Sequence, residues 1–145
     1  MSFATYTVTL DLDPDIDTGG NEVGYAQATG MQTTTGTALV DVTGLTVTFV
    51  AGTRPLSFSL ETELTNSVAA GETKAYIVLD GTVIGWISEP AAAMKWRQHS
   101  RTVRKSLTPG TTHTVKVQLA CTSGGGTAYL GGDPSSPASL TVLTR

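Results

Sequence analysis

Residues 40–64 read VDVTGLTVTFVAGTRPLSFSLETEL, and this stretch decides the fold. Apolar side chains recur at every second position in both of its halves. A period of two places one face of a β-strand against a core and the other face in water. Gly52 and Pro55 interrupt the alternation, so we expect a pair of strands joined by a turn. The apolar positions are Leu45, Val47, Phe49, Leu56, Phe58, Leu60 and Leu64.

The composition favours the same class of fold throughout the chain. The 145 residues suit one domain with a sizeable core. Threonine is the commonest residue, 16 residues are glycine, and only 14% are charged. Threonine and valine favour strands, and glycine favours the turns between them. We therefore predict an all-β protein, an antiparallel β-sandwich or jelly roll of about eight to ten short strands.

Other alternating stretches supply the remaining strands. Asp80-Gly81 lies between two apolar runs and predicts a hairpin with a type I′ turn. Residues 123–126, with three consecutive glycines, predict a second turn that returns the chain beside the strand before it. Residues 95–105 predict an edge strand. The further strands are expected at residues 3–12, 23–29, 75–79, 82–88, 113–121, 127–131 and 138–144.

Charge and cysteine content exclude several classes of protein. The net charge of −3 does not favour a nucleic-acid binder. A single cysteine, Cys121, excludes an internal disulfide framework and a multi-cysteine zinc site. Because Cys121 continues an apolar strand face, we expect a buried thiol. We expect no signal peptide and no membrane insertion, and we expect synthesis in a cytoplasm.

Several motifs resemble a known family. They are YAQATG, TGLTVTF followed by GTRP, LTPGTTHTVKVQ, the glycine-rich turn and SPASLTV. In this order they resemble the C-terminal head domains of tailed-bacteriophage minor tail and tail-fibre proteins, which are similar to tumour-necrosis-factor-like jelly rolls. The resemblance covers residues 23–145 and implies a head domain there. Residues 1–22 would form an N-terminal strand and acidic turn, a candidate attachment arm.

The resemblance implies a non-enzymatic structural protein on the virion surface, made in the host cytoplasm. It implies a minor tail or tail-tip protein that engages the host surface, assembles as a homotrimer and contacts other virion proteins. One alternative is a capsid decoration protein that binds and stabilises the phage shell. Another is a free-standing carbohydrate-binding module. The resemblance supplies no catalytic residue and no cofactor.

An acidic run near the N-terminus is a weak candidate for a metal site. Its spacing places an acidic residue at the first, third, fifth and twelfth positions of a calcium loop, but isoleucine replaces the glycine needed at the sixth. We expect a solvated acidic turn and no tightly held metal. The candidate ligands are Asp11, Asp13, Asp15, Asp17 and Glu22.

Signals for catalysis are weak. His99 and His113 are isolated, and no GxSxG nucleophile motif is present. We expect His99 to be solvated among cations and His113 to be half-buried at a strand start. Gly124–Gly126 lack the following lysine that a phosphate loop needs. We therefore predict that the chain is not an enzyme.

Residues 95–105 contain five of the nine lysines and arginines. One hypothesis is a docking strip for an anionic partner, such as a virion surface, a neighbouring subunit or a host glycan. The other is a solvated edge strand that charge protects from aggregation. Trp86 and Trp96 could stack on sugar rings, with Trp86 expected in the core and Trp96 at the surface. The candidate partner-binding residues are Lys95, Trp96, Arg97, Arg101, Arg104 and Lys105.

Overall fold

The structure, a computed structural model, describes residues 20–28, 30–90, 94–131 and 137–145. The expected strand at residues 3–12 lies outside these ranges. The regular secondary structure of the described residues is entirely β. The ten strands are β1 (Glu22–Ala28), β2 (Gln32–Thr34), β3 (Val40–Val50), β4 (Leu56–Asn66), β5 (Glu72–Leu79), β6 (Thr82–Pro90), β7 (Arg97–Lys105), β8 (Thr112–Ser123), β9 (Ala128–Leu130) and β10 (Ala138–Thr144).

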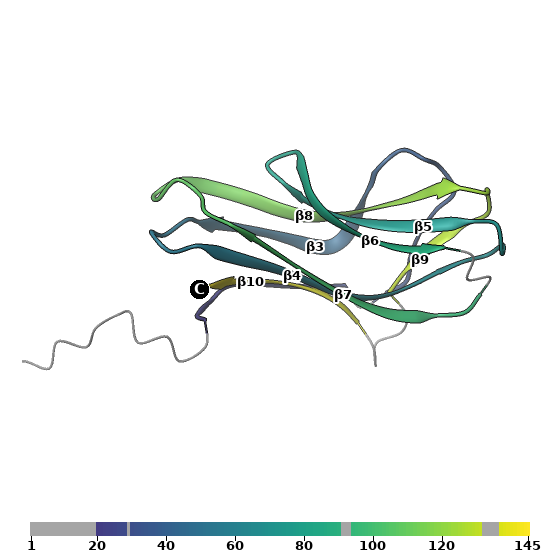
Figure 1. Cartoon of the computed structure of the whole chain (residues 1–145), viewed down its shortest axis with the longest axis horizontal. Helices are drawn as coiled ribbons and strands as arrows, with labels where there is room; N and C mark the ends of the chain where they lie inside the picture. Colours follow the sequence, from purple (N-terminus) through teal and green to yellow (C-terminus); the bar gives the residue numbers. More distant parts are fainter. Residues whose placement is uncertain (1–19, 29, 91–93, 132–136) are drawn as a thin grey trace, which may run out of the picture.

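The strands form two antiparallel sheets that face each other as two layers (Figure 1). In the first, sheet A, β4 pairs with β7 along one edge and with β10 and then β9 along the other. β1 continues the sheet beyond β10, and β2 continues it beyond β9. The second, sheet B, has the order β3-β8-β5-β6. This arrangement confirms the predicted antiparallel β-sandwich.

The expected pairing of the two strands in residues 40–64 is wrong. β3 pairs with β8 in sheet B, whereas β4 belongs to sheet A. The rings of Phe49 and Phe58 meet across the core instead, with centroids 5.9 Å apart. Alternation identifies the buried face of a strand but not its partner, and a five-residue connection can join two sheets as well as two paired strands.

The connection between β3 and β4 is held by the loop between β7 and β8. Ala51 donates its N–H to the carbonyl oxygen of Thr111 at 2.9 Å, and its own carbonyl accepts from Gly110 N–H at 2.8 Å. These bonds satisfy backbone groups that a hairpin would have paired within itself. The crossing between the sheets therefore costs no backbone hydrogen bond at Ala51.

The glycine-rich turn also crosses between sheets, so the predicted return beside the same strand is wrong. β8 belongs to sheet B and β9 to sheet A. Gly124, Gly125 and Gly126 have φ values of 70°, 70° and 83°, a region that L-residues seldom adopt. A Cβ on Gly124 would collide with the carbonyl oxygen of Ala70, so glycine is required there for close approach as well.

The Asp80-Gly81 prediction is confirmed. β5 and β6 pair directly on either side of these two residues. Asp80 has φ 48° and Gly81 φ 81°, the two positive values that a type I′ turn requires.

The core lies between the two sheets and draws on both. Its largest fully buried side chains include Leu45, Phe58, Ile77 and Leu140. Cys121 belongs to this core at 3% exposure, which confirms the predicted buried thiol. Both halves of residues 40–64 therefore bury their apolar faces as predicted, but from opposite sides.

Adjacent residues of β4 test this orientation. Leu60 is fully buried, whereas Glu61 is exposed on the outer face. We expect Leu60→Ala to lower the free energy of unfolding by about 2–5 kcal/mol because it leaves a cavity. The control Glu61→Ala should change it by less than about 0.5 kcal/mol. Urea unfolding measures both, and equal losses would contradict the assigned inner and outer faces.

Candidate functional site

The predicted edge strand at residues 95–105 is confirmed, since β7 pairs with β4 and with no other described strand. Its cations alternate between two faces. Arg97, Arg101 and Lys105 lie opposite Leu64, Leu60 and Leu56, so they share the face toward sheet B. Arg104 lies on the outer face of sheet A, opposite Ser57. The cations thus follow one edge but point to both of its sides.

The candidate docking residues are all accessible. Lys95, Arg97, Arg101, Arg104 and Lys105 are exposed, and Trp96 is 37% exposed. The ring of Trp96 contacts that of Tyr129 edge-on, with centroids 6.2 Å apart. The predicted surface position of Trp96 is therefore confirmed.

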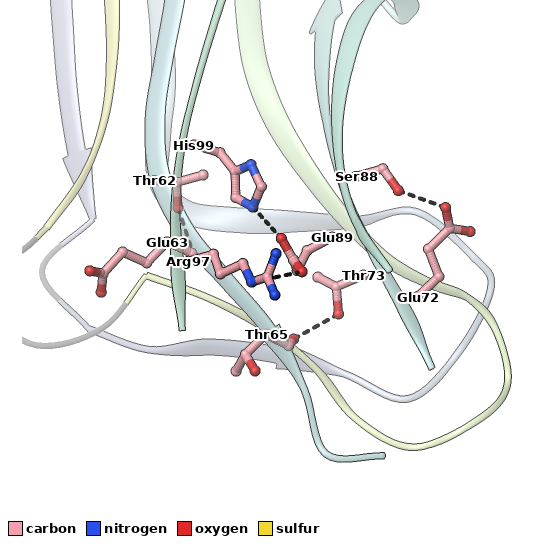
Figure 2. Close-up of polar contacts among 9 residues, drawn as sticks. All are labelled: Thr62, Glu63, Thr65, Glu72, Thr73, Ser88, Glu89, Arg97 and His99. Atoms are coloured by element: carbon pink, nitrogen blue, oxygen red, sulfur yellow. Dashed lines mark hydrogen bonds and ion pairs between the residues drawn. The ribbon is translucent and has the colours of Figure 1, made fainter. Parts of the chain in front are cut away.

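Glu89 is the charged residue that sequence reasoning missed. It lies on β6 at 2% exposure and meets two side chains of β7 (Figure 2). His99 Nε2 lies 2.7 Å from Glu89 Oε2, and Arg97 Nε lies 3.6 Å from Oε1. A buried carboxylate needs such partners, because desolvation of an unpaired charge is costly. These contacts join the edge of sheet B to the edge of sheet A.

The prediction that His99 is solvated among cations is wrong. Its side chain is 23% exposed and contacts Glu89. Chain order places His99 beside arginines, but alternation turns it toward the other sheet, where Glu89 lies. The signal that could have found the pair is the acidic residue in the otherwise apolar face of β6.

The same end of the core holds most of the other buried polar side chains. Thr73 donates to the carbonyl oxygen of Thr65 at 2.7 Å (Figure 2). Asn66 donates to Thr73 Oγ1 at 3.3 Å and accepts from Val68 N–H at 3.0 Å. These groups satisfy one another, so the cluster serves to hold the loop after β4 in place.

His113 is half-buried, as predicted, and it contacts the hairpin turn. His113 Nδ1 lies 2.6 Å from Asp80 Oδ2, and Thr114 N–H donates to Asp80 Oδ1 at 2.8 Å. The hydrogen bond from His113, and then that from Thr114, lower the pKa of Asp80 below its usual value of 3.8. His113 Nε2 is buried and has no hydrogen-bond partner among the described residues.

The prediction that Trp86 lies in the core is wrong, because its side chain is 57% exposed. β6 buries Gly85 and Ile87, which turns the residue between them outward. The run from Val83 to Ile87 is apolar on both faces, so the sequence could not show which face was inside. In register, Trp86 pairs with Tyr76, Tyr76 with Gln118 and Gln118 with Asp41.

This register creates a row of four side chains across the outer face of sheet B, which we call the sheet B row: Trp86, Tyr76, Gln118 and Asp41. Asp41 accepts from Gln118 Nε2 at 2.6 Å and from Lys116 Nζ at 2.9 Å. The hydrogen bond from Lys116, followed by that from Gln118, lowers the pKa of Asp41. The polar half of the sheet B row is therefore held by its own contacts.

The weak metal candidates cannot be assembled from the described residues. Asp11, Asp13, Asp15 and Asp17 lie outside the described ranges, and Glu22 is exposed at the start of β1. Within those ranges no group of three or more histidine, cysteine or acidic side chains could hold a metal ion. The described part of the chain also contains no helix with the length and apolar character to cross a membrane.

No protein family and no curated protein matches this chain. Similar solved structures include dimeric latent PorU from Porphyromonas gingivalis, with a TM-score of 0.44 and 9% identity over 88% of this chain and 14% of that chain. They also include infectious bursal disease virus, Gx strain, with a TM-score of 0.40 and 18% identity over 84% of this chain and 36% of that one. A family 35 carbohydrate binding module from an environmental isolate has a TM-score of 0.36 and 10% identity, over 84% of this chain and 97% of that one. The chain thus spans only a small part of PorU and about a third of the viral chain, and these similarities assign it no function.

The contact between β6 and β7 can be tested by removing one partner of Glu89. We expect His99→Ala to lower the free energy of unfolding by about 1–3 kcal/mol, because it strips the buried carboxylate of its shorter contact. Arg97→Ala is the control, since that side chain is 64% exposed and its contact is longer. It should cost less than about 1 kcal/mol. In chemical unfolding, Glu89→Gln in the His99→Ala background should recover part of the loss, and no recovery would contradict the assigned role of the charge.

The lowered pKa of Asp80 predicts how the stability of the folded protein changes as the pH falls. A carboxyl whose pKa is lowered by folding contributes stability above its unfolded-state pKa and loses it as pH falls through the folded-state value. Asp80→Asn keeps a residue that tolerates positive φ but removes this titration. We expect the unfolding midpoint of Asp80→Asn to fall less than that of the native protein as pH drops below 3.8. Parallel losses in urea melts over this pH series would contradict the assignment.

Proposed function

We propose that this chain is a non-enzymatic structural protein at the surface of a tailed-phage virion, and that it engages the host surface through strand β7. The resemblance of residues 23–145 to phage head domains supports the virion, and the β-sandwich is the fold that the resemblance implies. We infer binding through β7 from the concentration of exposed cations on this one sheet edge. Bacterial envelopes present anionic polymers, which such an edge attracts.

The uncompensated charge lies in the second half of β7. In the first half of β7, the charge of Arg97 is balanced by Glu89. Two further acidic residues, Glu61 and Glu63, lie opposite this half of the strand, on the outer face of sheet A. Arg101, Arg104 and Lys105 make no ion pair within the described ranges, so their charge is available to a partner. This half of β7 is the cationic edge of the proposal.

A homotrimer on the virion, in contact with other virion proteins, is part of the proposal. Individual exposed charge pairs are weak, and a trimer would present three cationic edges to one polymer. Simultaneous engagement raises the effective affinity without any new contact. Virion-borne protein should therefore bind more tightly than an isolated subunit.

The cationic edge is tested by the triple variant Arg101→Ser, Arg104→Ser, Lys105→Ser. We expect weaker binding to host cells, by up to about 3 kcal/mol for three exposed charges, and a flatter dependence on salt. Binding is measured with labelled protein over a salt series. Arg97 is left unchanged so that Glu89 keeps its partners.

The matched control is Arg101→Lys with Arg104→Lys, which retains the charge and should bind nearly as well as the native protein. Thermal melting checks that both variants fold, which we expect because these side chains are exposed. Unchanged affinity of the triple variant at low salt would contradict the proposal. Increased aggregation with normal attachment would favour the protected edge strand instead.

A further inference from the structure

We propose that an anionic polysaccharide binds across the outer face of sheet B, with its sugar rings on Trp86 and Tyr76, and passes over the edge of β6 so that its acid groups meet Arg101. This site goes beyond the cationic edge, because its aromatic side chains belong to β5 and β6 and act on sugar rings rather than on charge alone. It does not require that the chain belongs to a virion.

The aromatic half of the sheet B row gives the first argument. Trp86 is 57% exposed although tryptophan is among the largest apolar side chains. Its register partner Tyr76 is half-buried on the same outer face. Directly opposed residues of an antiparallel pair have Cβ atoms about 4.5–5.5 Å apart. With their Cβ atoms on directly opposed positions, the indole and the phenol provide neighbouring apolar surfaces of the kind on which the C–H faces of pyranose rings pack.

The polar half of the row gives the second argument. Gln118 donates one N–H to Asp41, and this hydrogen bond orients the Gln118 amide. A second N–H and the carbonyl oxygen of the amide are left for sugar hydroxyl groups. Ser88, on the neighbouring row, donates to Glu72 at 2.6 Å, and Thr122 donates to the same carboxylate at 2.6 Å. These fixed polar groups lose little conformational entropy when a ligand arrives.

The polar surroundings also favour a sugar over a protein partner. Lys74 and Lys116 lie on the rows to either side of Tyr76, and each pairs with a carboxylate. The centre of a protein–protein interface is depleted of charged residues. A lone aromatic strip bordered by ion pairs and amides instead suits a ligand covered with hydroxyl groups.

Arg101 decides the charge of the ligand. Gly85, next to Trp86, lets β7 approach β6 closely, since a Cβ there would lie 2.6 Å from Val103 Cγ2. The same added Cβ, which would point toward the inner side of β6, would lie 3.9 Å from Arg101 Nε. The exposed Arg101 side chain therefore lies at the edge where β6 meets β7, beside the strand that carries Trp86. On sheet B, Lys74 pairs with Glu72 and Lys116 pairs with Asp41, so these charges are neutralised. Arg101, in contrast, makes no ion pair with a described residue. A polysaccharide that follows the row toward β7 therefore gains from acid groups at that end.

The test uses polygalacturonate and hyaluronan as anionic probes and dextran as the neutral probe, with binding measured by calorimetry on the intact chain. We expect the native protein to bind at least one anionic probe and to bind dextran more weakly. Trp86→Ala should weaken anionic binding about tenfold or more. Tyr25→Ala removes an exposed aromatic side chain from β1 in sheet A and is the matched control, with no expected change.

Arg101→Ser should weaken anionic binding but leave dextran binding unchanged. Because Trp86 is exposed, Trp86→Ala should melt at the native temperature, which confirms that the loss is local. No binding to either anionic probe, or equal binding by Trp86→Ala, would overturn the inference. So would loss of self-association in Trp86→Ala without loss of probe binding, since a second copy would then occupy the face. These outcomes are separate from the cell-binding test, because Trp86→Ala leaves the whole cationic edge intact.

Discussion

Most of the long strands of this protein bury one face against the core, and the structure depends on how the chain meets that constraint. The consecutive strands β3 and β4 belong to opposite sheets, so that their alternating apolar sides meet across the core rather than side by side. Two of the connections that cross between the sheets, β3 to β4 and β8 to β9, carry local features that make the crossing possible. Ala51 gains backbone partners from another loop, and Gly124 adopts a conformation that also avoids Ala70.

The same constraint positions the candidate sites. Crossing the sheets brings β6, an edge of sheet B, next to β7, an edge of sheet A. At this seam Glu89 contacts His99 and Arg97, and Gly85 allows Arg101 to lie beside the strand of Trp86. The cationic edge and the sheet B row are therefore neighbours, although they point in different directions.

Alternation in the sequence predicts the fold class, the buried faces of β3 and β4, the edge strand and the Asp80-Gly81 turn, because these depend on local spacing and turn chemistry. It does not predict pairing, because a period of two carries no information on the partner. Trp86 and His99 were misplaced for related reasons. Trp86 lies in a run that is apolar on both faces, and His99 contacts Glu89, a residue on a different strand. Both errors fall within the seam that carries the candidate sites.

The exposure of Trp86 is the point on which the account most directly depends, and fluorescence measures it. In a Trp96→Phe variant, Trp86 is the sole tryptophan. The account predicts emission at long wavelength and efficient quenching by acrylamide, as expected for an indole in water. Emission at short wavelength with weak quenching would place Trp86 in the core and would contradict both the assigned outer face of sheet B and the site built on it.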